Sequence, residues 1–457
     1  STISCYRCVI NFVEFWEAGP LTVLLNASEF NFDQQLAALV ARKSARSLDV
    51  AQSVSQIIAD VAREGDEAVI RFTQQFDNHS CTAQSMHLTA EQVALCVDQT
   101  PVQLREDLEF AAERIRRFHM LQKPHEFKED DGAGGYYGMR WRPVDAAGLY
   151  VPGGQASYPS SVLMNAVAAR VAGVKRLAMM VPCPGGVFNN AVICAAHIAG
   201  VDEIYTIGGA QAVAALALGT SSIGAVDIIV GPGNAYVAEA KRQLFGHVGI
   251  DMIAGPSEVL VVVQSGLLAP ELAAMDLLAQ AEHDADAQSI LLTENSQYAN
   301  EVHHAVQTHL KDLPRKEIAG RSWSENGGVI VAPVERFAEI INYIAPEHLE
   351  LVVEEPEKLS EKVDHAGAIF IGGKTPEAVG DYVGGPNHVL PTSRSARFSS
   401  GLSVYDFMKR TTILSCSHDS LRILGPVAAR LADAEGLGAH AASVRMRLDD
   451  HEEEILG

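Results

Sequence analysis

Apolar residues in the first part of the chain recur three and four positions apart, which is the period of an amphipathic helix. This spacing runs from Phe32 to about His119, with its second half between Val102 and Phe118. It predicts a helical N-terminal region over residues 21–122. The polar, glycine-containing stretch 123–138 that follows is typical of a linker or an exposed loop.

Beyond that stretch the pattern changes to short β-branched or apolar runs that alternate with helical segments. Such alternation is typical of a parallel sheet flanked by helices. We therefore expect an α/β fold with two doubly wound, Rossmann-like parallel-sheet units, residues 123–250 and 251–380. After Asp381 the strand pattern stops, and residues 381–457 are expected to form a small helical C-terminal arm. The predicted strands are 148–154, 177–182, 202–208, 226–233, 258–264, 288–294, 327–333 and 367–373.

The composition narrows the classes of function. Of 457 residues, 47% are hydrophobic and 20% charged, which is too apolar for a mainly disordered chain. The formal net charge of −22 disfavours nucleic acid and anionic membrane surfaces as partners. No uncharged apolar run approaches the roughly 18 residues of a membrane span. The seven cysteines are scattered and odd in number, so a reducing cytoplasm is the expected location.

Three glycine turns are candidates for ligand binding, because a turn from strand to helix lets a phosphate approach the backbone. They are Gly208–Gln211, Gly231–Asn234 and Gly255–Glu258. None has the G-x-G-x-x-G or P-loop spacing, so each turn alone is as consistent with packing as with a dinucleotide. Three in succession favour a binding crevice.

Several residues have the chemistry of metal ligands. Gln280 and His283 stand at i and i+3 in a helical segment, so both point from one helical face. Asp381 with His388, and Glu435 with His440, lie in polar, glycine-containing segments at element boundaries. Single helical histidines are more often structural, and the spacing does not show that these residues converge.

Glu347 and His348 place a carboxylate and an imidazole side by side, just before a predicted strand. These two groups are suited to proton transfer near neutral pH. Adjacent side chains of a strand point in opposite directions, so the pair serves one site only if the local turn departs from strand geometry. A solvated pair at the start of a strand is the alternative. His303 and His304, in a polar helical segment, are expected on the surface.

Eight segments, read in order, resemble the histidinol dehydrogenase family, from about residue 30 to residue 448. They are GLYVPGG with YPSSVLMNA, IGGAQA, VGPGNAYVAEAKR, GIDMIAGPSEVL, LLAQAEHDADAQSILLT, PEHLEL, GDYVGGPNHVLPT with ARFSSGLSVYDFMKRTT, and AEGLGAH. Residues 1–20 fit no part of the resemblance and are treated as an unmatched extension.

The resemblance implies a zinc-dependent, NAD-linked homodimer that oxidises L-histidinol to L-histidine through L-histidinal, the last two steps of histidine biosynthesis. By the same resemblance the active site is shared between subunits, and one zinc ion is held by Gln280, His283 and Asp381 with His440 from the partner subunit. Glu347 and His348 become the acid and base pair. The substrate contacts are Ser257, Gln280, His283, His348, Asp381, His388, Glu435 and His440, and the NAD contacts are Tyr150, Gln211 and Asn234.

Three other functions remain open on the residues alone. The first is an NAD-linked dehydrogenase for another amino alcohol or a polar diol. The second is a zinc hydrolase, since a cluster of histidine and aspartate beside a carboxylate can activate water. The third is a non-catalytic binding protein. The donor set would also accept manganese or cobalt.

Overall fold

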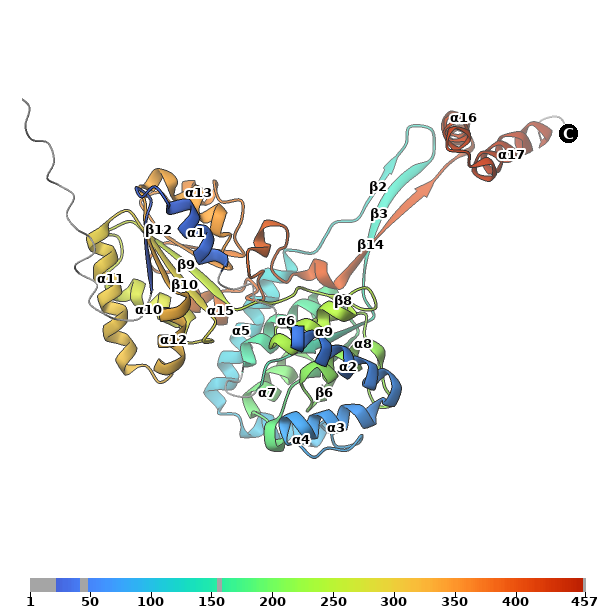
Figure 1. Ribbon diagram of the computed structural model, residues 1–457. Helices are drawn as coiled ribbons and strands as arrows, with labels where there is room; N and C mark the ends of the chain where they lie inside the picture. Colours follow the sequence, from blue (N-terminus) through green and yellow to red (C-terminus); the bar gives the residue numbers. More distant parts are fainter. Residues whose placement is uncertain (1–21, 42–47, 154–157, 455–457) are drawn as a thin grey trace, which may run out of the picture.

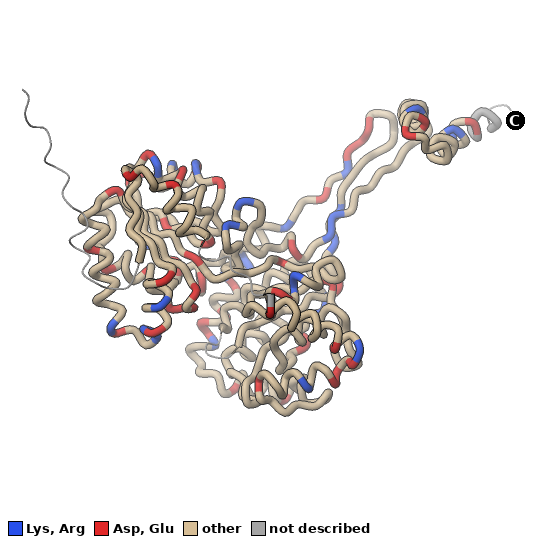
Figure 2. The backbone as a smooth tube through the Cα atoms, in the orientation of Figure 1, with Lys and Arg blue, Asp and Glu red and all other residues tan. Residues whose placement is uncertain are grey.

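The structure is a computed structural model, and it describes residues 22–41, 48–153 and 158–454, with side chains up to Asp449. The unmatched residues 1–20 lie outside this part of the chain. Two α/β units lie beside each other, and a long ribbon with two helices projects from them (Figure 1). Acidic side chains are spread over both units (Figure 2). Within the described ranges, none of the helices has the length and apolar composition needed to cross a membrane.

The first unit is built on a parallel sheet of five strands in the order β6-β5-β4-β7-β8. The strands are β4 (Ala146–Tyr150), β5 (Arg176–Met180), β6 (Glu203–Tyr205), β7 (Ile228–Val230) and β8 (Gly249–Ile250). One face is covered by α2 (Leu48–Glu64), α3 (Asp66–Asp77), α8 (Gly209–Leu218) and α9 (Ala235–Leu244). The other face is covered by α4 (Ala90–Gln99), α5 (Val102–Met120), α6 (Pro159–Ala172) and α7 (Asn190–Ala199).

The second unit has six parallel strands in the order β1-β11-β10-β9-β12-β13. They are β1 (Val23–Asn26), β9 (Glu258–Val263), β10 (Gln288–Thr293), β11 (Gly328–Val331), β12 (His348–Val352) and β13 (Ala368–Ile371). Helices α10 (Pro270–Ala281), α11 (Ser296–His309) and α12 (Lys316–Asn326) pack on one face. Helices α1 (Phe32–Ala41) and α13 (Phe337–Ile344) pack on the other, and α14 (Pro356–Ser360) and α15 (Glu377–Tyr382) follow. The central strands are buried on both faces, which explains their continuous apolar runs.

The ribbon is an antiparallel sheet of three strands, β14-β3-β2. Its strands are β2 (Phe127–Asp130), β3 (Tyr136–Pro143) and β14 (Met408–Ser415), and it leads to helices α16 (His418–Ala434) and α17 (Gly438–Glu454). Short 3₁₀ turns η1 (Pro184–Gly186), η2 (Leu310–Asp312), η3 (Val334–Arg336), η4 (Ser395–Arg397) and η5 (Val404–Phe407) complete the described elements.

The two predicted parallel sheets and the helical arm are confirmed, but the chain differs from expectation at three places. The helical N-terminal region also contains β1, which pairs with β11 of the second sheet. The expected loop 123–138 contains β2 and the start of β3, and the expected helical arm contains β14 ahead of its two helices. Strands β2 and β14 are largely exposed and rich in polar residues, so they lack the apolar signal that marks the buried strands.

Candidate active site between the two units

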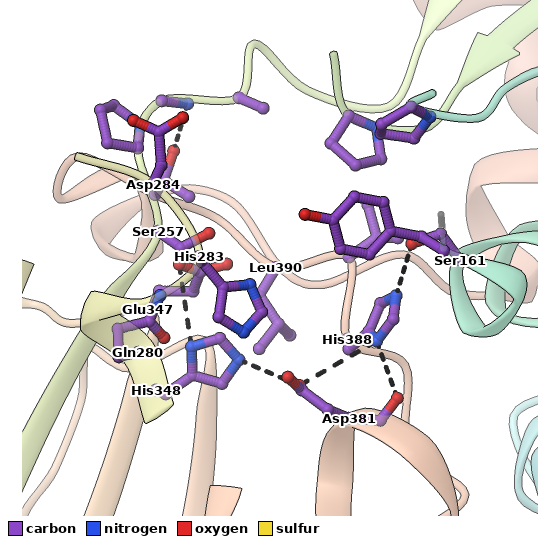
Figure 3. Close-up of a pocket in the computed structure, with 18 of the residues that line it drawn as sticks. Ser161, Ser257, Gln280, His283, Asp284, Glu347, His348, Asp381, His388 and Leu390 are labelled. Carbon is purple, nitrogen blue, oxygen red and sulfur yellow. Dashed lines mark hydrogen bonds and ion pairs between the residues drawn. The ribbon is translucent and has the colours of Figure 1, made fainter. Parts of the chain in front are cut away.

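A cavity of about 610 Å³ lies between the two units (Figure 3). From the first unit, its wall includes segments that follow the carboxyl ends of β4 and β7. From the second unit, Ser257 and Glu347 lie immediately before β9 and β12. The turn Gly255–Glu258 therefore leads into a strand, and its expected place between strand and helix is wrong. The lining residues with polar chemistry are Tyr158, Ser160, Ser161, Asn234, Ser257, Gln280, His283, Asp284, Asp286, Glu347, His348, Glu377, Asp381, Tyr382, His388 and Thr392.

Glu347 and His348 both reach this cavity although they are neighbours in the chain. Helix α13 ends at Ile344, and the left-handed backbone of the next residue, Ala345 (φ 50°), turns the chain sharply before β12 begins at His348. Glu347 therefore lies ahead of the strand, where the alternation of side chains does not yet apply. Both side chains are buried, with exposed fractions of 4%.

One residue of β9 holds both side chains. The backbone N–H of Glu258 donates to Oε2 of Glu347 at 2.8 Å, and the backbone carbonyl of Glu258 accepts from Nδ1 of His348 at 3.0 Å. A carbonyl can only accept, so Nδ1 carries the ring proton. Nε2 of His348 is left as the basic nitrogen.

Three carboxylates surround the imidazole of His348. Its Nδ1 lies 3.6 Å from Oε1 of Glu377 and 3.7 Å from Oε2 of Glu347, and its Nε2 lies 3.6 Å from Oδ1 of Asp381. Burial lowers the pKa of His348, but the carboxylates of Glu377, Glu347 and Asp381 outweigh burial and raise the pKa well above its usual value. A divalent cation beside Asp381 would oppose this rise, because its charge disfavours a neighbouring imidazolium.

Gln280, His283 and Asp381 converge on the cavity from α10, from the turn after it and from α15 (Figure 3). Gln280 is fully buried, and neither its Oε1 nor its Nε2 has a hydrogen-bond partner among the described residues. Burial lowers the pKa of His283, which favours the neutral imidazole that binds metals. Burial opposes ionisation of Asp381, yet its histidine neighbours, His348 first, lower its pKa overall. An orphaned amide oxygen, a neutral imidazole and a carboxylate fit a divalent cation such as zinc.

A second grouping overlaps with this one. In the described part of the chain, ligand atoms of His348, Glu377 and Asp381 also lie within 4.8 Å of one another. This spacing is close enough for the three residues to hold a metal ion. Nδ1 of His348 is already engaged with a carbonyl, and its Nε2 is the basic nitrogen of the site. The set with Gln280 and His283 therefore fits a metal ion better, because its buried amide has no hydrogen-bond partner among the described residues.

His388 lies across Asp381 from His348. Its Nδ1 donates to the backbone carbonyl of Asp381 at 2.9 Å, and its Nε2 lies 3.2 Å from Oγ of Ser161. Burial lowers the pKa of His388, although Asp381 partly opposes this effect. Ser161 was not identified from the sequence, although it stands in the YPSS segment of the resemblance. Glu377 was also missed, and its position one helical turn before Asp381 could have revealed it.

The three residues expected at NAD have different surroundings. Asn234 lines the cavity, and its Oδ1 accepts from the backbone of Tyr236 and Val237 as the N-cap of α9. The hydroxyl of Tyr150 accepts from the backbone N–H of Gly209, and Gln211 is buried beside that glycine. Tyr150 and Gln211 lie near the carboxyl edge of the first sheet, outside the wall of the cavity.

Glu435 and His440 do not reach this cavity. Both are exposed, Glu435 directly after α16 and His440 in α17, and these two helices lie at the far tip of the ribbon (Figure 1). In one copy of the chain they are thus far from the other expected metal and substrate residues.

A sequence model of the histidinol dehydrogenase family matches residues 40–448. The chain belongs to the histidinol dehydrogenase family. The histidinol dehydrogenase of Gluconobacter oxydans strain 621H is 55% identical over 426 residues, which cover 93% of this chain and 99% of that protein. The histidinol dehydrogenase of Rhodospirillum rubrum is 55% identical over 427 residues, covering 93% and 98% of the two chains.

A solved member of the histidinol dehydrogenase family has the same fold. The crystal structure of histidinol dehydrogenase from Elizabethkingia anophelis superposes with a TM-score of 0.90 at 33% sequence identity, covering 95% of this chain and 100% of that one. The ribbon and its helices therefore belong to a fold shared by the family.

Proposed function

We propose that this protein oxidises L-histidinol to L-histidine through L-histidinal, with two molecules of NAD accepting the two hydrides. Family membership supports the reaction, and the observation that carries the proposal for this chain is the fixed pair Glu347 and His348 in a cavity with metal-ligand side chains. A location in the cytoplasm stays a prediction.

Gln280, His283 and Asp381 would hold the zinc ion, with His440 of the second copy as a further ligand. Bound zinc supplies a template, since an amino alcohol that carries an imidazole has two nitrogen donors able to chelate a metal. The buried amide of Gln280, which has no protein partner in the described ranges, supports this assignment.

His348 would act as the base of the first oxidation. Its Nδ1 proton is engaged by the carbonyl of Glu258, so Nε2 takes the hydroxyl proton of the substrate as hydride leaves the carbinol carbon. The amide of Glu258 keeps the neighbouring carboxylate of Glu347 in the same wall.

Glu347 would act in the second oxidation. A carboxylate beside the aldehyde can remove a proton from the water that adds to the carbonyl carbon, and hydride then leaves the hydrated carbon. Glu347 stands before β12 and lines the cavity, which supports this role.

Ser257 and His388 line the cavity and would contact the substrate, together with the metal ligands and His348. Tyr150, Gln211 and Asn234 would contact NAD near the carboxyl edge of the first sheet. Both side-chain atoms of Gln211 are buried with no hydrogen-bond partner among the described residues, which supports a polar ligand near this turn.

A homodimer would complete the site with Glu435 and His440 of the second copy. The arm that carries them exposes a series of large apolar side chains, which a second copy would cover. They are Leu414, Ile423, Leu424, Val427, Leu431, Leu437 and Met446.

Substrate choice tests the proposal against a dehydrogenase for another amino alcohol. With zinc present, the specificity constant kcat/KM for L-histidinol should exceed that for L-phenylalaninol, which lacks imidazole donors. Equal constants would show that the imidazole is not recognised, and turnover without NAD would indicate a hydrolase.

A further inference from the structure

Two acids, Glu350 (buried) and Asp276 (partly buried), lie directly beneath the site and take no part in the steps above. Glu350 stands two residues after His348 on the same face of β12 and is 2% exposed. Asp276 lies one turn before Gln280 on α10, which packs against this face. The side chains of Asp276 and Glu350 share a hydrogen bond, so one of the two carboxyl groups carries a proton.

Glu350 also reaches the short helix that carries two of the carboxylates of the site. Its Oε1 accepts a hydrogen bond from the backbone N–H of Glu377 at 2.7 Å, at the start of α15. Asp381 follows one turn later on α15. The two α15 carboxylates lie on either side of His348, each 3.6 Å from a ring nitrogen.

We propose that Glu350 is a positioning residue, which anchors α15 so that Asp381 and Glu377 keep their places around His348 and the metal. This proposal rests on the proposed function and assigns no contact between Glu350 and substrate. Asp276 holds the anchor in place from α10, the helix that also presents Gln280. Glu350 thus ties together the strand of the base and the two helices of the metal ligands.

The physical chemistry favours a protonated anchor. Burial first, and then the charge of Asp276, raise the pKa of Glu350 to about 8. A buried acid is costly unless its polar atoms are hydrogen-bonded, whereas an apolar side chain of similar size would fill the same space without that cost. The free-energy cost of burying Glu350 is therefore offset by its hydrogen bonds to Asp276 and to the backbone of Glu377.

Three substitutions of Glu350 separate anchoring from packing. In Glu350→Gln the amide oxygen still accepts from Glu377 and the amide N–H donates to Asp276. In Glu350→Leu the volume stays similar but the acceptor is lost, and in Glu350→Asp the acceptor is withdrawn by one methylene. The control is Leu351→Ala, which removes buried volume from the opposite face of the same strand.

The measurements are kcat and KM for L-histidinol, Tm, and zinc affinity by competition with a chelator. Glu350→Leu should lower zinc affinity by about 10- to 100-fold, as for other groups that orient metal ligands. It should also lower kcat by about 10-fold or more. Glu350→Gln should stay close to wild type, and Leu351→Ala should lower Tm while leaving kcat and zinc affinity unchanged.

Wild-type kcat and zinc affinity in Glu350→Leu would overturn the proposal, as would equal losses in Glu350→Gln and Glu350→Leu. If Glu350→Leu does not fold, Glu350→Asp decides by the same two readouts. Wild-type protein that binds zinc but oxidises no L-histidinol would refute the proposed function, and the zinc affinities would still test the anchor.

Discussion

Nδ1 of His348 donates a hydrogen bond to the backbone carbonyl of Glu258 over 3.0 Å. This contact fixes the tautomer of the imidazole, because a carbonyl oxygen cannot donate. The nitrogen that can accept a proton is therefore Nε2, on the side of Asp381. A hydrogen bond between the first residue of β9 and the first residue of β12 thus determines which nitrogen of His348 would act as the base in the proposed reaction.

Replacing His348 by asparagine tests this base. The asparagine amide can still donate to the carbonyl of Glu258, but it cannot accept the substrate proton. We expect kcat for L-histidinol oxidation to fall by about 10²- to 10⁴-fold. The control is His365→Asn, since His365 does not line the cavity. A loss below 10-fold, or an equal loss in both variants, would contradict the role of His348.

Replacing Glu347 by glutamine should separate the two oxidations. Glutamine keeps an oxygen for the N–H of Glu258, but it cannot take a proton from water. Oxidation of L-histidinal should therefore slow more than oxidation of L-histidinol. Single-turnover measurements started from each compound give the two rates, and an unchanged rate from L-histidinal would show that Glu347 does not activate water.

Because His440 lies far from the cavity of its own chain, mixing two variants can decide whether it serves the cavity of the partner subunit. The His440→Ala variant alone should lose both zinc and activity. When His440→Ala subunits are mixed with His348→Asn subunits, each hybrid dimer has one site with both native residues. Random exchange then predicts recovery to about one quarter of wild-type activity.

The outcome of mixing depends on where His440 acts. If His440 serves the cavity of its own chain, every site in the mixture carries a substitution and activity stays at the level of the separate variants. Full zinc retention in His440→Ala alone would exclude this residue from the ligand set.

His303 predicts a pH dependence of stability away from the site. The sequence suggested a surface residue, but His303 is half-buried on α11 with its ring 6.3 Å from that of Trp323. Burial first, and then His304, lower the pKa of His303 from 6.5 to about 4. The unfolded chain therefore binds more protons between these values, and stability should fall as the pH drops from 6.5 toward 4.

Urea denaturation at pH 7 and pH 5 measures this effect. His303→Gln should lose less stability than wild type between the two pH values, because glutamine does not titrate. His304→Gln is the matched control. His304 is exposed, and burial is the larger cause of the shift at His303, so most of the pH dependence should remain in this variant. Identical losses of stability in wild type and His303→Gln would show that His303 does not cause the pH dependence.

The buried parallel strands were predictable because their apolar runs are continuous. Strand β1 was not, because its partner β11 lies about 300 residues further along the chain and four residues carry little pattern of their own. The ribbon strands β2 and β14 are exposed, so their polar residues resemble a loop.

Most of the candidate site could be named from the sequence, but its geometry could not. The objection to Glu347 and His348 in one site is removed by the left-handed turn at Ala345, a non-glycine residue that gives no sequence signal. Glu350 was missed because a single acid within HLELV looks like an outward-facing strand position. Its partners, Asp276 and the backbone of Glu377, come together only in the folded chain.

The central claim is a four-electron oxidation at one metal-containing site. The most direct measurement is the amount of NADH formed per L-histidinol consumed, followed to completion with zinc-loaded and with chelator-treated protein. The account predicts about two NADH per L-histidinol, lost with the metal and restored by zinc. One NADH per substrate, or turnover that does not respond to the chelator, would contradict it.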